Sequence, residues 1–193
     1  MMQKDKRVNQ DPEIKETFFV RDMMKGDVAE ILALQDKILH EDGFDPRWFY
    51  PFSEEELKVL VGKNTGISVG AFMEGRLVAF RTGCISGEEY DEITRNLGSP
   101  FTEISCFLMN GAFVDKAYRG NHLQQMLTEQ CIARCRKRGI ETFLAVVHPD
   151  NLPSIKSLKK IGFIERSRQK IFNGKYDRII LLYDAARAGR TEG

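Results

Sequence analysis

The sequence predicts a single α/β domain with about seven strands and about four helices. Two observations indicate this class. Short β-rich runs alternate with segments of helical spacing, and 193 residues with 42% hydrophobic content are enough for one packed core. The chain also shows no internal repeat. We expect the domain to cover residues 16–185, with flexible tails at 1–15 and 186–193.

Charge and hydropathy exclude several classes of protein. The 29 basic and 28 acidic residues nearly cancel, which argues against a nucleic-acid footprint. The N-terminus is polar, and no later run approaches the roughly 20 apolar residues of a membrane span. We therefore expect a soluble, cytoplasmic protein that binds neither nucleic acid nor membrane.

The cysteines do not predict a metal site. Cys84, Cys106, Cys131 and Cys135 lack paired short spacings, and only three histidines accompany them. Cys131 and Cys135 have helical spacing and are expected in the core. Cys106 has no neighbouring base that would make it a nucleophile, so a buried strand cysteine is the favoured interpretation.

The first half of the chain alternates strands and helices. "TFFVRD" is typical of a strand, and "GDVAEILALQDKIL" has helical spacing. After an aromatic loop, Ser53 and Glu56 have the spacing of a capping box, which opens a helix that ends near Gly62. Two further strands follow, with a hairpin turn predicted at Glu74 and Gly75.

The next segments lead to the stretch that is most informative about function. "SGEEYDEITRNLGSP" is predicted to be a loop with one or two helical turns, and "ISCFLMNGAFV" to be a strand. Gly111 interrupts that strand and indicates a bulge or a close backbone approach. A helix then follows "AYRGNH" and ends at Gly139.

The last segments are a strand, a helix and a hairpin. "TFLAVV" is typical of a buried strand, and Asp150 or Asn151 is expected to cap a helix that ends at Gly162. Strands at 164–172 and 175–183 are expected to form a hairpin. Asn173 and Gly174 favour its tight turn.

The junction after the "ISCFLMNGAFV" strand predicts an anion site. A strand, a loop and a helix N-terminus follow in turn, so backbone N–H groups without helical partners lie at the positive end of the helix dipole. Arg119 adds a charge, Gly120 permits close approach, and Asn121 can donate. The alternative is that Arg119 and Gly120 only turn the corner and cap the helix.

Two motifs resemble those of the GNAT superfamily of N-acetyltransferases. Val114, Tyr118, Arg119 and Gly120 match its acetyl-coenzyme A motif. A second stretch of the family is matched by Asn151, Ser154, Gly162 and Phe163. The order of strands and helices is also similar from about Phe18 to Tyr183. Together these signals are fairly specific, whereas either alone is weak.

The resemblance implies both a fold and a cofactor. The fold is α/β (α+β): a central mixed, mostly antiparallel sheet, splayed open between the fourth and fifth strands, with acetyl-coenzyme A as cosubstrate in the gap and no metal. Backbone groups near Phe113 and Val114 would hold the pantetheine arm and the thioester. The pyrophosphate would bind the amides of Arg119, Gly120, Asn121, His122, Leu123 and Gln124. Asn151 would contact the coenzyme, and Ser154 would lie on the helix that lines it.

The sequence departs from the family pattern at four positions. His122 and Gln124 stand where the family usually has glycines, and Lys116 where proline is common. We expect the His122 side chain to point outward into solvent, away from the phosphates. Leu158 replaces the tyrosine that many members use to protonate the departing thiolate. Because a leucine cannot donate a proton, the general acid stays unassigned.

Two residues are candidates for the base, and each has an alternative interpretation. Glu103 precedes the fourth strand, near where some members have an activating glutamate, but it could be a solvated carboxylate at a loop end. His148 ends the fifth strand with a suitable intrinsic pKa, but it could merely hydrogen-bond the turn.

The acceptor site is the least determined part. Trp48 and Tyr50 are hypothetical substrate contacts, because an aromatic wall with nearby acids favours a cationic amine. Most aromatic residues of this loop are expected in the core instead.

The resulting hypothesis is an acetyl-coenzyme A-dependent N-acetyltransferase. It would act by direct attack of a primary amine of a small molecule or peptide, as a monomer or homodimer. The alternative is a non-catalytic acyl-coenzyme A-binding sensor or regulatory module of the same fold. A different nucleotide-binding α/β protein is disfavoured, since the chain lacks a Walker-type lysine and a dinucleotide fingerprint.

Overall fold

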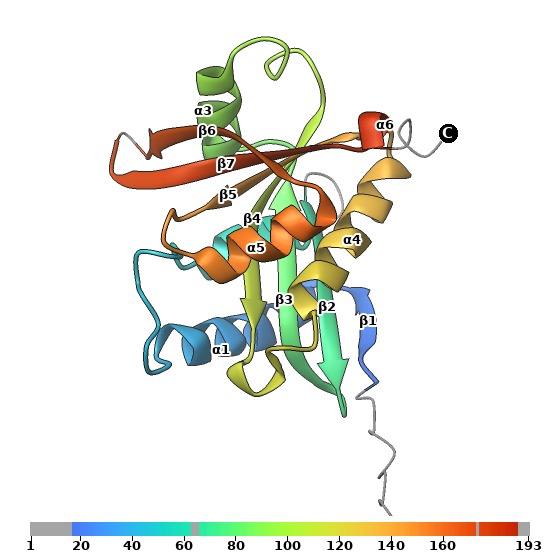
Figure 1. Ribbon diagram of the computed structural model, residues 1–193. Helices are drawn as coiled ribbons and strands as arrows, with labels where there is room; N and C mark the ends of the chain where they lie inside the picture. Colours follow the sequence, from blue (N-terminus) through green and yellow to red (C-terminus); the bar gives the residue numbers. More distant parts are fainter. Residues whose placement is uncertain (1–16, 63–65, 173, 189–193) are drawn as a thin grey trace, which may run out of the picture.

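The computed structural model describes residues 17–62, 66–172 and 174–188. They form one seven-stranded sheet in the order β1-β2-β3-β4-β5-β7-β6, with helices on both faces (Figure 1). The strands are β1 (Phe19–Asp22), β2 (Gly66–Met73), β3 (Arg76–Cys84), β4 (Cys106–Val114), β5 (Thr142–Val147), β6 (Ile164–Ile171) and β7 (Tyr176–Asp184). The α-helices are α1 (Val28–Leu39), α2 (Glu54–Leu60), α3 (Glu88–Leu97), α4 (Leu123–Arg136), α5 (Leu152–Ile161) and α6 (Ala185–Ala188). Two 3₁₀ turns, η1 (Lys25–Asp27) and η2 (Lys116–Tyr118), complete the described elements.

The sheet is splayed between β4 and β5. Neighbouring strands pair antiparallel except β4 and β5, which pair in parallel over Cys106–Met109 and Thr142–Ala145 alone. Both strands continue beyond the last pair, Met109 with Ala145, but no longer pair with each other. The predicted mixed, mostly antiparallel sheet and its opening between strands four and five are therefore confirmed.

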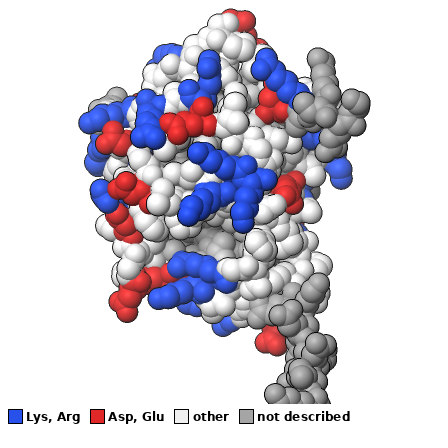
Figure 2. Space-filling model, in the orientation of Figure 1, with Lys and Arg blue, Asp and Glu red and all other residues white. Residues whose placement is uncertain are grey.

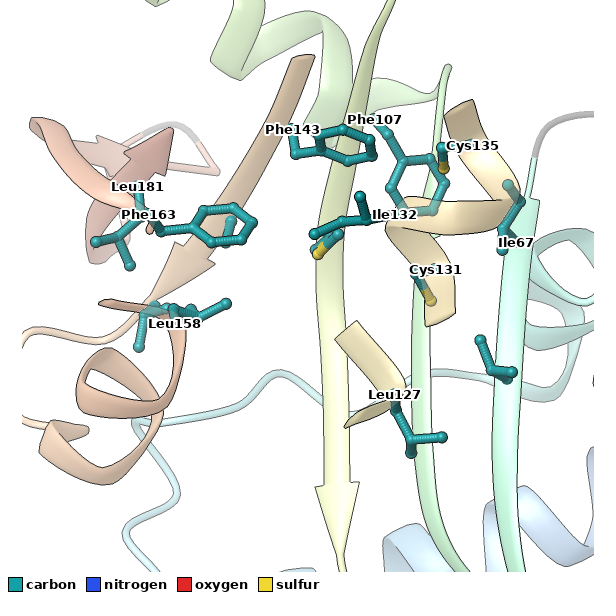
Figure 3. Packing of buried hydrophobic residues seen from close by; sticks show 14 of the residues in the cluster. Ile67, Phe107, Leu127, Cys131, Ile132, Cys135, Phe143, Leu158, Phe163 and Leu181 are labelled. Atoms are coloured by element: carbon teal, nitrogen blue, oxygen red, sulfur yellow. The ribbon is translucent and has the colours of Figure 1, made fainter. Parts of the chain in front are cut away.

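Two layers of helices cover the sheet. On one face α4 and α5 enclose the main core, where Cys131, Ile132 and Cys135 lie near Phe107 and Phe143 (Figure 3). On the other face α1 and α2 bury Ile31, Leu34, Ile38 and Leu57 against Phe80 and Phe113 of the sheet. Each fully buried apolar side chain contributes about 1.5–3 kcal/mol to this packing. All four cysteines are free and buried, which was predicted for Cys106, Cys131 and Cys135.

Most local signals in the sequence are confirmed. Ser53 and Glu56 form the reciprocal capping box of α2, and Asn151 caps α5 by accepting from the Ser154 N–H. Glu74 and Gly75 turn the β2–β3 hairpin with positive φ angles. Beside Gly111 the β3–β4 register shifts, which confirms a bulge.

The close approach at Gly111 involves a ring rather than a backbone. A Cβ atom on Gly111 would come within 2.6 Å of the Phe52 ring. Glycine is therefore needed there to admit Phe52 beside β4.

Two segments differ from the expectation. Residues 88–97 form the full helix α3 rather than a loop with a turn or two, and Ile93 of this helix is buried in a core cluster. Ala185–Ala188 form the short α6, where a flexible tail was expected from residue 186. Together, α3 and α6 bring the number of α-helices in the described residues to six, against about four expected. The predicted turn residue Asn173 and the predicted tail at 1–15 lie outside the described residues.

Candidate active site

A cavity of about 720 Å³ passes through the opening between β4 and β5. Its walls include Asn110–Val114 of β4 and Ala145–Val147 of β5. The N-terminal ends of α4 and α5 lie at one end and α3 lies at the other. The loop between α1 and α2 also lines the cavity, and its Glu41 contacts Arg119 at the α4 end. The cavity therefore joins the two faces of the sheet at the place where the sheet opens.

The α4 end is shaped by left-handed backbone. Gly120 has φ of 94° and His122, the N-cap of α4, has φ of 57°. His122 is exposed and lines the cavity, and its side chain makes no capping hydrogen bond to the helix. The first-turn N–H groups of α4 are thus not capped by this side chain and suit an anion.

Arg119 is held by two contacts at this end. Its Nη2 donates to Glu41 Oε2 at 2.6 Å, and its Nε donates to the Val114 carbonyl oxygen at 3.1 Å. The Arg119 side chain is 48% exposed and that of Glu41 9% exposed. An acid from the loop after α1 therefore neutralises the cation predicted to face phosphate.

A hydrogen bond joins α4 and α5 across the opening. Gln124 Nε2 donates to Ser154 Oγ at 2.8 Å, and Asn151 Oδ1 caps the same helix as Ser154. All three predicted cofactor residues line the cavity. At position 124, where the family usually has a glycine, this chain therefore has a glutamine whose side chain links α4 and α5.

The remaining predicted cofactor residues line the cavity except Asn121, which is absent from its wall. Phe113, Val114 and Leu123 line the cavity, and Phe113 packs against the rings of Phe49, Phe52 and Phe80. Asn121 donates from Nδ2 to the Tyr118 carbonyl oxygen in the loop before α4. Leu158, in place of the family tyrosine, is fully buried beside Phe163 and Leu181 (Figure 3) and reaches the cavity wall.

The two predicted bases are not among the residues that line the cavity. Glu103 is exposed in the turn before β4. His148 is buried, and its Nδ1 accepts from the Asp150 N–H at 3.1 Å, which is the turn-bonding alternative. Burial, followed by the charge of Arg178, lowers the pKa of His148. Neither position favours a catalytic role. Burial raises the pKa of Cys106 to about 11, so that its thiol is protonated at neutral pH.

Three polar residues at the α3 end were missed by sequence reasoning. Asn110 Nδ2 donates to Glu89 Oε2 at 3.0 Å, and buried Arg178 lies near this pair. Burial raises the pKa of Glu89, although the Asn110 hydrogen bond and the Arg178 charge oppose this shift. The sequence did contain a signal for two of these residues. Asn110 is a polar residue within an apolar strand, and Arg178 directly precedes the apolar run of another strand.

The aromatic loop forms part of the cavity wall. Trp48, Phe49, Tyr50 and Phe52 all line the cavity, and Phe49 and Phe52 also pack onto Phe113. Tyr50 is 50% exposed and stacks on Phe172 at 5.8 Å between ring centroids. The hypothesis that Trp48 and Tyr50 contact substrate therefore agrees with their positions.

Unpartnered polar atoms gather at the cavity. Within the described residues, four buried side-chain nitrogen or oxygen atoms have no hydrogen-bond partner: Glu41 Oε1, Trp48 Nε1, Arg81 Nε and Asn110 Oδ1. All four residues line this one cavity. Because unpartnered buried polar atoms are costly and rare in folded proteins, their grouping indicates a site for a polar ligand.

Arg81 lies where the sheet opens. It is 3% exposed, and its Nη2 contacts Sδ of Met109, the last β4 residue paired with β5. Burial lowers the pKa of Arg81 to about 10. The guanidinium of Arg81 therefore places a positive charge where β4 and β5 begin to separate.

Neither a metal centre nor a membrane span is found in the part of the chain that the structure describes. There, no three His, Cys, Asp or Glu residues are grouped to hold a metal ion. No helix among these residues is long and apolar enough to cross a membrane.

The opened sheet and its cavity agree with the fold expected from the two motifs, and comparison gives the family. A profile of the acetyltransferase (GNAT) family matches residues 30–163. The chain therefore belongs to the GNAT acetyltransferase family. A comparison with curated proteins gives no match.

Solved structures of low sequence identity share the fold. The ribosomal-protein-S18-alanine N-acetyltransferase from Escherichia coli is 16% identical, with a TM-score of 0.65 over 88% of this chain and 94% of that one. The protein yncA from Salmonella typhimurium, solved with its cofactor acetyl-CoA, is 15% identical, with a TM-score of 0.64 over 88% and 94%. The PaiA N-acetyltransferase from Thermoplasma acidophilum, in complex with coenzyme A, is 13% identical, with a TM-score of 0.64 over 87% and 99%.

Proposed function

We propose that the protein is an acetyl-coenzyme A-dependent N-acetyltransferase that acts on a primary amine by direct attack. The observation that supports this best is the cavity through the β4–β5 opening. It connects the N-terminus of α4, which the His122 side chain does not cap, with the α3 end, where Asn110 Oδ1 is buried without a partner among the described residues. A donor and an acceptor could therefore approach from opposite faces and meet at the opening.

The residues at the α4 end fit the coenzyme. Gly120 and His122 have positive φ angles, and the backbone N–H groups of residues 120–124 would bind the pyrophosphate. The Arg119 N–H donates to the Lys116 carbonyl oxygen instead. Lys and Arg side chains gather at the middle of the face on which α5 lies (Figure 2). The exposed Lys156, Lys159 and Lys160 of this helix would attract the phosphates.

The chemistry needs few side chains at the thioester. Bound acetyl-coenzyme A would supply an activated acetyl group with a thiolate leaving group of pKa roughly 8.5, as for an ordinary thiol. Backbone groups near Phe113 and Val114 would hold the pantetheine arm and the thioester oxygen. Leu158 excludes water but transfers no proton, so the thiolate would take its proton from another source.

The non-catalytic acyl-coenzyme A sensor is the second candidate. The replacement of the usual tyrosine by Leu158 favours it. The unpartnered Asn110 Oδ1 at the α3 end favours the enzyme instead, because a sensor has no need of an acceptor chamber.

Release of free thiol separates the two candidates. Purified protein is mixed with acetyl-coenzyme A and a panel of amines, and the thiol is measured against amine-free controls. An enzyme releases thiol faster with at least one amine. Binding of the coenzyme without amine-dependent release would instead indicate the sensor.

A matched pair of glycine variants tests the phosphate loop. Gly120 and Gly26 both have open space around a new Cβ, but only Gly120 has a positive φ. We expect Gly120→Ala to weaken coenzyme binding at least tenfold, because the loop must give up its left-handed turn. Gly26→Ala should leave binding unchanged. Equal effects of the two variants would contradict the phosphate loop.

A further inference from the structure

Three polar side chains converge on the acceptor end of the cavity from separate elements. Glu89 comes from the first turn of α3, Asn110 from β4, and Arg178 from β7. Ile93 of α3 and Ile180 of β7 belong to one buried cluster, so α3 covers the face of β7 that carries Arg178, two residues before Ile180. The three side chains thus share one chamber although they are far apart in sequence.

Glu89 and Asn110 form a site for hydrogen-bond donors. The amide nitrogen of Asn110 is used on Glu89, while Asn110 Oδ1 is buried without a donor among the described residues. The carboxylate of Glu89 lines the same cavity. A protonated amine has three donors and no acceptor, and matches this pair of oxygens.

Arg178 forms a site for an anion. It is 6% exposed, and its Nη1 donates to the Asp177 carbonyl oxygen at 2.8 Å. Its guanidinium lies 5.3 Å from the centroid of the Tyr176 ring. No described carboxylate lies within 4.0 Å of it, although its charge acts on Glu89. A fixed, buried guanidinium without a carboxylate partner suits a ligand carboxylate.

The amine site lies next to the opening of the sheet. Asn110 directly follows Met109, the last β4 residue paired with β5. An amine held by Asn110 and Glu89 therefore sits beside the gap through which a thioester would reach this face. The carboxylate site at Arg178 lies on β7, the strand that pairs with β5 on the far side of the gap.

We propose that the acceptor is an amine that also carries a carboxylate, of the α-amino acid type. Glu89 and Asn110 bind its amine and Arg178 its carboxylate. This inference rests on the proposed acetyltransferase function. Glu89 takes one proton from the ammonium, and the nitrogen lone pair forms the bond to the acetyl carbonyl carbon. The C–S bond breaks with its electron pair on sulfur. The second proton lost by nitrogen goes to the thiolate or to solvent, and Glu89 returns its proton to solvent.

A paired substrate screen tests the acceptor class. Thiol release is measured with the twenty common L-amino acids, their α-amides, and the carboxylate-free amines phenethylamine and spermidine. We expect at least one amino acid to react with kcat/KM tenfold or more above its amide. Amides or carboxylate-free amines that react equally well or better would overturn the inference but leave the acetyltransferase in place. Absence of both coenzyme binding and turnover would overturn the proposed function as well.

Variants of Arg178 test the carboxylate site. Arg178→Gln should raise KM for the amino acid at least tenfold with little change for the amide, and Arg178→Lys should restore part of the loss. Arg95→Gln, an exposed α3 residue outside the cavity, is the control. An equal effect of Arg178→Gln on both substrates would contradict the carboxylate site.

The amine site has its own variants. Glu89→Gln should lower kcat and flatten the pH–rate profile, whereas the exposed Asp91→Asn should not. Both proteins should bind acetyl-coenzyme A as the wild type does in calorimetry, which shows that they are folded. Unchanged kcat in Glu89→Gln would remove Glu89 as the base.

Discussion

Arg119 and Glu41 form a contact of 2.6 Å between Nη2 and Oε2 at the coenzyme end of the cavity. The guanidinium also bonds the Val114 carbonyl oxygen, a group that the pantetheine arm would use. The cation that is proposed to face the phosphates is thus held against a carboxylate, which would repel the same phosphates. Glu41 is therefore expected to reduce the affinity for coenzyme.

Glu41→Gln should bind acetyl-coenzyme A about two- to fivefold more tightly, since a partly exposed charge acts with about 1 kcal/mol or less. Calorimetric titration at low and moderate salt measures this change. The gain should shrink as salt rises, because the repulsion is screened. A weaker complex in the variant would show that Glu41 positions Arg119 for the phosphates instead.

The left-handed backbone conformation of His122 lowers the free energy of unfolding, whereas glycine would adopt it without this cost. A non-glycine residue at φ of 57° costs about 1 kcal/mol. We expect His122→Gly to unfold at a temperature at least as high as the wild type, and His122→Ala to be about 1 kcal/mol less stable than His122→Gly. Thermal denaturation measures both. An alanine variant as stable as the glycine variant would contradict the left-handed conformation.

Glu89 should make stability depend on pH. Burial raises its pKa above the ordinary 4.5, so the folded protein holds a proton that the unfolded chain releases. The free energy of unfolding therefore decreases as pH rises from about 4.5 through the folded pKa. The neighbouring charges are Arg178, Glu92 and Glu56.

Urea denaturation of the wild type and Glu89→Gln between pH 5 and 8 tests this dependence. The wild type should lose stability relative to the variant as pH rises. Parallel pH profiles of the two proteins would show that Glu89 has no raised pKa.

Arg81 is expected to cost stability in the absence of ligand. Its buried Nε has no partner among the described residues, and its Nη2 contacts only a weak sulfur acceptor. Replacement of a poorly paired buried charge by an apolar residue of similar size is often neutral or stabilising. Arg81→Met should therefore be at least as stable as the wild type in urea denaturation. A loss of more than about 2 kcal/mol would show that the guanidinium is well satisfied.

The sequence predicted those parts of the fold whose signals are local. Ser53 and Asn151 cap helices through contacts within three residues, and the strands follow from β-rich runs. The cofactor end was predicted for the same reason, since its residues are close together in the chain. Its ion pair was not predicted, because Glu41 and Arg119 are 78 positions apart.

The α3 end could not be predicted, because distant contacts hold it. Residues 88–97 have few apolar positions, and the N-cap Gly87 has no side chain to cap the helix. The helix is held instead by two distant hydrogen bonds. The Phe172 N–H donates to Glu92 Oε2, and Asn96 Nδ2 donates to Gln169 Oε1. Glu89 was therefore expected in a loop and was not considered as a candidate base, whereas Glu103 and His148 were.

Calorimetric titration with acetyl-coenzyme A, alongside S-acetylpantetheine as the analogue without pyrophosphate, tests the central claim most directly. The account predicts micromolar binding of acetyl-coenzyme A, about −8 kcal/mol, and binding at least tenfold weaker for the analogue. Such a result would show that the loop from Arg119 to Gln124 holds phosphate with His122 in the glycine position. Equal affinity for the two compounds, or no binding of either, would contradict it.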